Sequence, residues 1–107
     1  MAFHVESLSL ELIALLRPLL PRIKRCDRSL ADQISRAASS VALNLGESRL
    51  SDPGNRRARL HTAAGSAAEV HTALRVVRAW GHVPERDMSA AISTVDQICA
   101  ILWKMTH

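Results

Sequence analysis

The sequence predicts an all-α fold, and three features lead to that prediction. Leu and Ala supply most of the apolar residues and Arg most of the cations, and all three favour helix. Only four Gly and four Pro are present, and no run of β-branched residues could build a sheet. A chain of 107 residues has room for one domain with one core. We therefore expect residues 1–107 to form a single antiparallel, up-down-up-down four-helix bundle.

The first helix is predicted over about residues 7–24, with Ser7 as its N-cap. Its apolar seam consists of Leu8, Leu12, Leu15, Leu19 and Ile23. Pro18 and Pro21 fall within this helix, and an interior proline costs about 3 kcal/mol. The helix either kinks at the prolines or stops and restarts there. The apolar spacing continues in phase through both prolines, which favours one kinked helix.

Three further helices are predicted, at about residues 29–50, 55–80 and 87–105. Asp27 or Ser29 caps the first of these. The composition of residues 51–55 predicts a turn, and Gly81 is the expected C-terminal cap of the next helix. The last helix has an apolar face wider than one bundle position can bury. That width indicates that another subunit covers part of it.

Polar residues recur at steps of three and four on the second and third of the predicted helices, which places them on one face of each. This set, here called the polar ladder, comprises Gln33, Arg36, Ser40, Asn44, Glu47, Ser66 and Glu69. Small residues lie beside the ladder on both helices and allow the two backbones to approach closely.

An antiparallel hairpin about residues 52–53 sets the height of each ladder residue. It places Ser40 level with Gly65 and Ser66. It places Asn44 level with His61 and Thr62, and Glu47 level with Ala58 and Arg59. It also places Arg36 level with Glu69, and we expect those two to form a partly buried ion pair. The better-attested role of such a pair is to fix register and partner rather than to add stability. The ladder is therefore interpreted as a structural latch.

The formal net charge is +4, and twelve of the fourteen basic residues are Arg. This balance indicates an acidic partner, such as RNA or DNA, although arginines on solvated faces would give the same composition. The predicted layout gathers them at the two ends of the bundle. The first basic cluster comprises Arg22, Lys24, Arg25, Arg28, Arg78 and Arg86. The second basic cluster comprises Arg49, Arg56, Arg57 and Arg59.

No arrangement of residues indicates an enzyme. The ladder carries no nucleophile with a neighbouring His base, no phosphate-binding glycine loop is present, and no Glu-x-x-His pair could hold a di-iron centre. We expect no catalytic residues, no metal and no cofactor. No membrane span or signal peptide is predicted, so a cytoplasmic location with Cys26 and Cys99 as free thiols is expected. Sequence-specific reading of single strands is not expected, because Phe3, Trp80 and Trp103 are the only aromatic residues for stacking.

Two motifs resemble those of the bacterial four helix bundle protein family. They read Gln33-x-x-Arg36-Ala37-Ala38-x-Ser40-Val41-x-x-Asn44-Leu45-Gly46-Glu47 and Ala63-Ala64-Gly65-Ser66-x-x-Glu69-Val70. That family includes the intervening-sequence proteins of large-subunit ribosomal RNA genes. It is related to the accessory variability protein of diversity-generating retroelements. The resemblance covers about residues 8–83, and Ser35 stands where the family usually carries a second basic residue.

The resemblance implies a non-enzymatic bundle that assembles into a ring, with a homopentamer as the expected form. In the retroelement relatives such a ring binds a reverse transcriptase and nucleic acid. The expected function is an oligomeric scaffold that binds nucleic acid, or an enzyme acting on it, through arginine-rich surfaces. The alternative is a protein–protein assembly factor that binds no nucleic acid.

Overall fold

The computed structural model describes the backbone of residues 2–107 and the side chains of residues 4–107, and within this range it contains helices and no strands. The five helices are α1 (Ala2–Leu16), α2 (Leu20–Cys26), α3 (Arg28–Ser48), α4 (Pro53–Trp80) and α5 (Glu85–Thr106). Met1 of the predicted domain and the Phe3 side chain lie outside the described part. The all-α class is confirmed. The prediction of four helices is wrong, because the first predicted helix is divided into two helices, α1 and α2.

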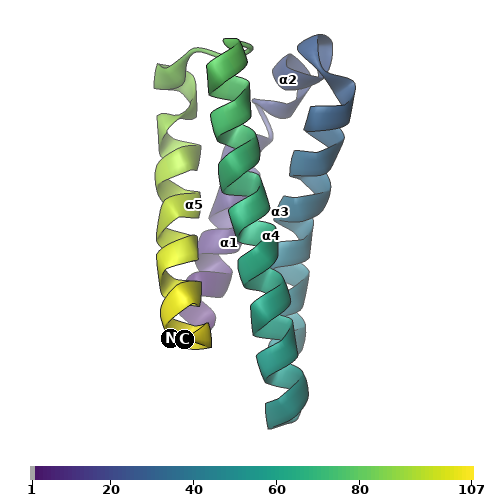
Figure 1. Cartoon of the computed structure of the whole chain (residues 1–107), viewed down its shortest axis with the longest axis vertical. Helices are drawn as coiled ribbons and strands as arrows, with labels where there is room; N and C mark the ends of the chain where they lie inside the picture. Colours follow the sequence, from purple (N-terminus) through teal and green to yellow (C-terminus); the bar gives the residue numbers. More distant parts are fainter. Residues whose placement is uncertain (1) are drawn as a thin grey trace.

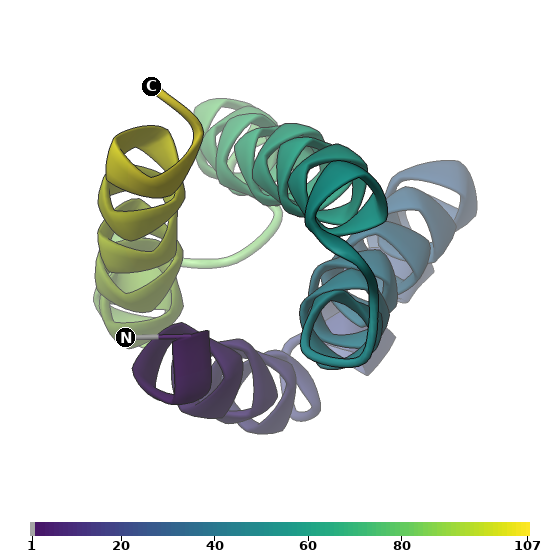
Figure 2. The same cartoon turned by 90° about the horizontal axis from the view of Figure 1, so that it is seen from below.

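The four long helices run side by side along an elongated molecule of 42 × 22 × 20 Å (Figure 1). Seen along its axis, α1 lies next to α5 and α3, and α4 completes the circuit between α3 and α5 (Figure 2). Successive long helices alternate in direction. The short α2 contacts α3 at the end of the molecule where α3 and α5 begin, and the α3–α4 turn forms the opposite tip.

Proline explains why the first predicted helix is broken rather than kinked. The helical bonding of α1 ends with the bond from the Arg17 N–H to the Ile13 carbonyl, at 3.0 Å. Pro18 has no N–H to continue the ladder, and Leu19 forms a tighter bond to the Leu16 carbonyl at 2.9 Å. Pro21 then occupies the first turn of α2, where its missing N–H costs nothing. Ser7 is not the N-cap, because α1 already begins at Ala2.

Acidic side chains cap the next two helices. The Asp27 carboxylate accepts a hydrogen bond from the Leu30 N–H at 3.0 Å, so Asp27 rather than Ser29 is the N-cap of α3. The Asp52 carboxylate accepts one from the Asn55 N–H at 2.9 Å, so α4 starts at Pro53 and the predicted turn is shorter than expected. Gly81 ends α4 with φ of 73°, as predicted.

The cap at Asp52 has a consequence for acid stability. The hydrogen bond from the Asn55 backbone N–H, helped by the Asn55 side chain, lowers the pKa of Asp52 below its ordinary value. A lowered folded-state pKa means that the cap stabilises the fold above the unfolded-state pKa. Its contribution is lost as the pH falls through the folded-state pKa.

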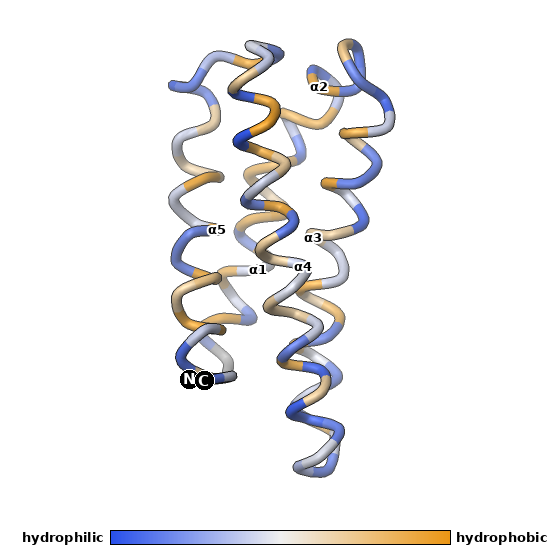
Figure 3. The backbone as a smooth tube through the Cα atoms, in the orientation of Figure 1, coloured by the Kyte–Doolittle hydropathy of each residue, from blue (hydrophilic) through white to orange (hydrophobic). Residues whose placement is uncertain are grey.

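The core runs the length of the molecule and changes in character between α3 and α4. Leu12, Leu74 and Leu102, from α1, α4 and α5, are completely or almost completely buried. Between α3 and α4 the buried residues include alanines, namely Ala37, Ala38, Ala63 and Ala67. Hydrophilic residues cover the α3–α4 turn and the α2–α3 junction (Figure 3). The apolar residues are therefore concentrated between the helices, and polar residues predominate at the two ends of the bundle.

The core assignment predicts the effect of truncating Leu74, which is fully buried. Leu74→Ala should lower the free energy of unfolding by about 2–5 kcal/mol, because it leaves a cavity among tightly packed neighbours. The matched control is Leu50→Ala, since Leu50 is 89% exposed and should shift stability by less than about 0.5 kcal/mol. Urea denaturation followed by circular dichroism measures both. Equal effects of the two substitutions would contradict the assigned core.

Candidate functional site

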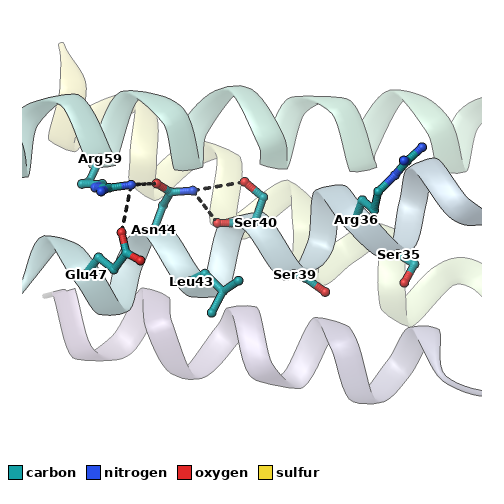
Figure 4. Close-up of a pocket in the computed structure, with 8 residues that line it drawn as sticks. All are labelled: Ser35, Arg36, Ser39, Ser40, Leu43, Asn44, Glu47 and Arg59. Atoms are coloured by element: carbon teal, nitrogen blue, oxygen red, sulfur yellow. Dashed lines mark hydrogen bonds and ion pairs between the residues drawn. The ribbon is translucent and has the colours of Figure 1, made fainter.

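Four residues of the polar ladder, Ser40, Asn44, Glu47 and Ser66, belong to a connected set of polar contacts between α3 and α4. The Ser40 and Ser66 hydroxyl oxygens lie 2.8 Å apart and join the two helices directly. The Asn44 amide nitrogen donates to the Ser40 carbonyl at 2.9 Å and to the Ser40 hydroxyl at 3.1 Å (Figure 4). Asn44 is 9% exposed, so these bonds satisfy an amide that the helix pair largely removes from water.

Arg59 continues the set toward the α3–α4 turn. Its guanidinium donates to the Asn44 side-chain oxygen at 3.3 Å and pairs with the Glu47 carboxylate at 2.8 Å (Figure 4). The predicted level pairs Ser40 with Ser66 and Glu47 with Arg59 are therefore in contact. This part of the ladder links the two helices, as the structural interpretation requires.

The predicted partly buried pair between Arg36 and Glu69 is wrong. Both side chains are exposed, and neither forms an ion pair with any residue in the described range. Arg36 extends away from Ser40 and Asn44 (Figure 4). The register sets the two at similar heights, but they lie at the open edge of the groove. Water solvates both charges there, and an exposed pair would gain little. Gln33 is exposed as well.

Acidic residues neutralise half of the first basic cluster. Arg22 lies 2.9 Å from the Asp87 carboxylate, Arg78 lies 3.1 Å from that of Glu85, and Arg86 lies 3.9 Å from Asp87. The first of these pairs ties α2 to α5. Arg22, Arg78 and Arg86 were predicted to bind a partner, and they are paired with acidic residues of the chain itself.

The second basic cluster is also largely engaged. Arg49 pairs with Glu6 of α1 at 2.8 Å, and Arg59 pairs with Glu47. The Arg56 Nε donates to the Ser48 carbonyl at 3.2 Å. Across both clusters, the following side chains are exposed and form neither an ion pair nor a side-chain hydrogen bond with a described residue: Lys24, Arg25, Arg28 and Arg57.

The remaining chemical groups do not gather into a reactive centre. Burial raises the pKa of the Cys99 thiol above its ordinary value, and the nearby Asp96 carboxylate adds to the shift. A thiol held protonated in this way is a poor nucleophile at neutral pH. Cys26 and Cys99 are both free. Within residues 4–107 there is no group of three or more His, Cys, Asp or Glu side chains that could hold a metal ion.

The sequence analysis overlooked an apolar patch that α1 and α3 share. Leu10 is 59% exposed and Leu43 is 66% exposed. The Glu6–Arg49 ion pair fixes the antiparallel register of the two helices. Leu10 lies four residues after Glu6 on α1, and Leu43 lies six residues before Arg49 on α3, so the two leucines differ in height by about 3 Å. Leu43 also points to the α1 side of α3 (Figure 4). The sequence signal that could have identified these two leucines is their position outside the apolar seams of their helices.

The sequence matches the family model for the 23S rRNA-intervening sequence protein over residues 6–104. The chain belongs to this family. The match extends the resemblance seen in α3 and α4 to nearly the whole chain. No helix in the described part of this family member is long and apolar enough to cross a membrane.

A solved structure shares the fold of this family member. It is a protein of unknown function from the S23 ribosomal protein family of Bacteroides thetaiotaomicron VPI-5482. The two superpose with a TM-score of 0.85 at 17% identity, over 95% of this chain and 97% of the other. An identity this low establishes a common fold and nothing more. A search of curated proteins finds no match.

The ladder geometry predicts the outcome of a double-mutant cycle on its two serines. Ser40→Ala and Ser66→Ala should each destabilise the protein. The double variant should lose less than their sum by about 0.5–1.5 kcal/mol, because both remove the same hydrogen bond. A parallel cycle on Arg36→Ala and Glu69→Ala should give a coupling near zero. Chemical denaturation supplies all the free energies. A larger coupling for the charged pair than for the serines would contradict this geometry.

Proposed function

We propose that this family member is a non-enzymatic scaffold that binds nucleic acid, RNA in the first instance, through its exposed cations. The observation that carries the proposal is the set Lys24, Arg25, Arg28 and Arg57, which are exposed and free of ion pairs within the described residues. Phosphate groups would supply the missing negative charges. The family's association with 23S rRNA genes, printed in its name, favours RNA over other anions.

Self-association belongs to the same proposal. A four-helix-bundle unit that repeats in a closed ring would present the three free cations of the first basic cluster once per subunit. Repetition turns a weak local attraction into a strong one. The Leu10–Leu43 patch is the apolar surface that such contacts would cover. The family resemblance described above extends the proposal to a homopentamer and to a reverse transcriptase as a further partner.

The Leu10–Leu43 patch also favours the alternative, a protein-assembly factor that binds no nucleic acid. The two functions differ in what nuclease treatment does to partners captured from the native host. Partners that are lost with nuclease support the nucleic-acid scaffold. Partners that are retained, from a protein that does not bind purified RNA, support the assembly factor.

Binding should depend on the free cations rather than on the paired ones. Arg25→Gln with Arg28→Gln should weaken binding of structured RNA and flatten the slope of log K against log salt by about two. The control, Arg78→Gln with Glu85→Gln, removes an ion pair without changing the net charge and should leave the slope unchanged. Fluorescence anisotropy across a salt series measures both. Wild-type protein that binds no structured RNA at low ionic strength would refute the proposal.

The apolar patch should control assembly. Leu43→Asp should shift the protein toward a monomer, because a charge placed in a dry interface loses its hydration. Leu50→Asp provides the control, since Leu50 is 89% exposed and lies at the hairpin tip. Native mass spectrometry and sedimentation velocity report the subunit number. A wild-type monomer at micromolar concentration would refute self-association, and an unchanged oligomer in Leu43→Asp would exclude this patch as its interface.

A further inference from the structure

A second pocket lies at the corner between the first turns of α4 and the end of α5. Its volume is about 290 Å³, and Leu60 and Met105 supply apolar contacts within it. Arg56, Arg57 and His107 also line it. The α3–α4 hairpin extends beyond the end of α5, so the overhanging first turns of α4 form one wall (Figure 1).

The cationic wall is partly fixed and partly free. The Arg56 Nε donates to the Ser48 carbonyl at 3.2 Å, which anchors this guanidinium to the end of α3. Its terminal nitrogens form no hydrogen bond to any described residue and remain open to a ligand. Arg57 is exposed and has no ion-pair partner within the described range. Two adjacent guanidinium groups with unused donors suit a phosphate, which accepts several hydrogen bonds at once.

The opposite wall is aromatic. The His107 ring lines the pocket and stacks on Trp103, with ring centroids 3.4 Å apart and planes inclined by 17°. Trp103 is 62% exposed, so this stack is open to solvent. A planar group that enters the pocket meets the His107 ring, which Trp103 supports by stacking although Trp103 does not itself line the pocket. Stacking of this kind is independent of base identity, since every base has a π-face.

We propose that this pocket binds one nucleotide unit, with the base on the His107 ring that Trp103 supports by stacking, and the phosphate at Arg56 and Arg57. The combination of two arginines with aromatic rings distinguishes a nucleotide from other classes of ligand. A simple anion would use the arginines but not the rings, and an apolar helix would leave both guanidinium groups unpaired. The inference rests on the proposed nucleic-acid binding and gives it a defined site. The nucleotide unit belongs either to a single-stranded segment or to a free nucleotide.

The two tryptophans of the chain supply a direct spectroscopic test. Trp80 lies at the far end of the molecule, where it stacks with His82 at a centroid separation of 6.2 Å. In Trp80→Phe protein, Trp103 is the only fluorophore of its kind, and adenosine monophosphate or single-stranded oligoadenylate should quench it. In Trp103→Phe protein the same ligands should leave the emission of Trp80 nearly unchanged. Tighter binding of the oligonucleotide identifies a strand as the source, and equal affinities identify a free nucleotide.

Affinity measurements with matched variants complete the test. Trp103→Ala and Arg57→Ala should each weaken oligoadenylate binding by about tenfold. The corresponding controls, Trp80→Ala and Arg75→Ala, replace exposed residues outside the pocket and outside both basic clusters, and they should change it less than about twofold if the strand is short enough to occupy one site. All four side chains are exposed, and far-UV circular dichroism confirms that each variant is folded.

Two negative results have different meanings. Structured RNA that binds to the wild type while Trp103 emission stays constant and Trp103→Ala has no effect overturns the pocket alone. Absence of any RNA or nucleotide binding at low salt overturns both the pocket and the proposed function.

Discussion

The close approach of α3 and α4 is the constraint on which the other features of the molecule depend. Ala37 and Ala38 of α3, with Ala63 and Ala67 of α4, are buried where larger residues fill the rest of the core. Serine has one of the shortest polar side chains, yet the Ser40 and Ser66 hydroxyls meet at 2.8 Å. Such a contact requires two backbones that are brought together by alanines. Gly65 is not part of this approach, because a Cβ built there meets nothing within 4 Å.

Ion pairs between helices reduce the exposed positive charge. Carboxylates of Glu6, Glu47, Glu85 and Asp87 each lie against an arginine, and most of these pairs join different helices. Half-exposed pairs of this kind contribute little stability, but they hold neighbouring helices in register and cancel much of the field around them. The cations without such partners in the described residues then carry the positive balance of the sequence. They include Arg36 and Arg75 along the bundle as well as the free members of the two clusters.

Much of this could be predicted from sequence because periodicity and capping are local. The helix class, the hairpin register, the Gly81 cap and the Ser40–Ser66 level all follow from spacing along one or two helices. The Arg36–Glu69 pair could not, because spacing gives the height of a residue but not its distance from the groove floor. The break between α1 and α2, which the missing N–H of Pro18 causes, was also not predicted, because the apolar spacing continues through it. Ile23 is fully buried although it belongs to the separate short helix α2. The apolar spacing therefore stays in phase across the break, although the helix does not continue.

The positions of the free cations argue further that they serve recognition. A cation in the last turn of a helix is favoured by the helix dipole, which accounts for Lys24 and Arg25 in α2. Arg28 is the first residue of α3, and Arg57 follows the first turn of α4, where the dipole disfavours positive charge. Neither first turn contains an acidic residue, although Asp27 and Asp52 cap the helices. Folding alone gives no reason to place arginines there. A bound anion would pair with these guanidinium groups rather than with the helix N-termini, because the Asp27 and Asp52 carboxylates already accept the Leu30 and Asn55 N–H groups.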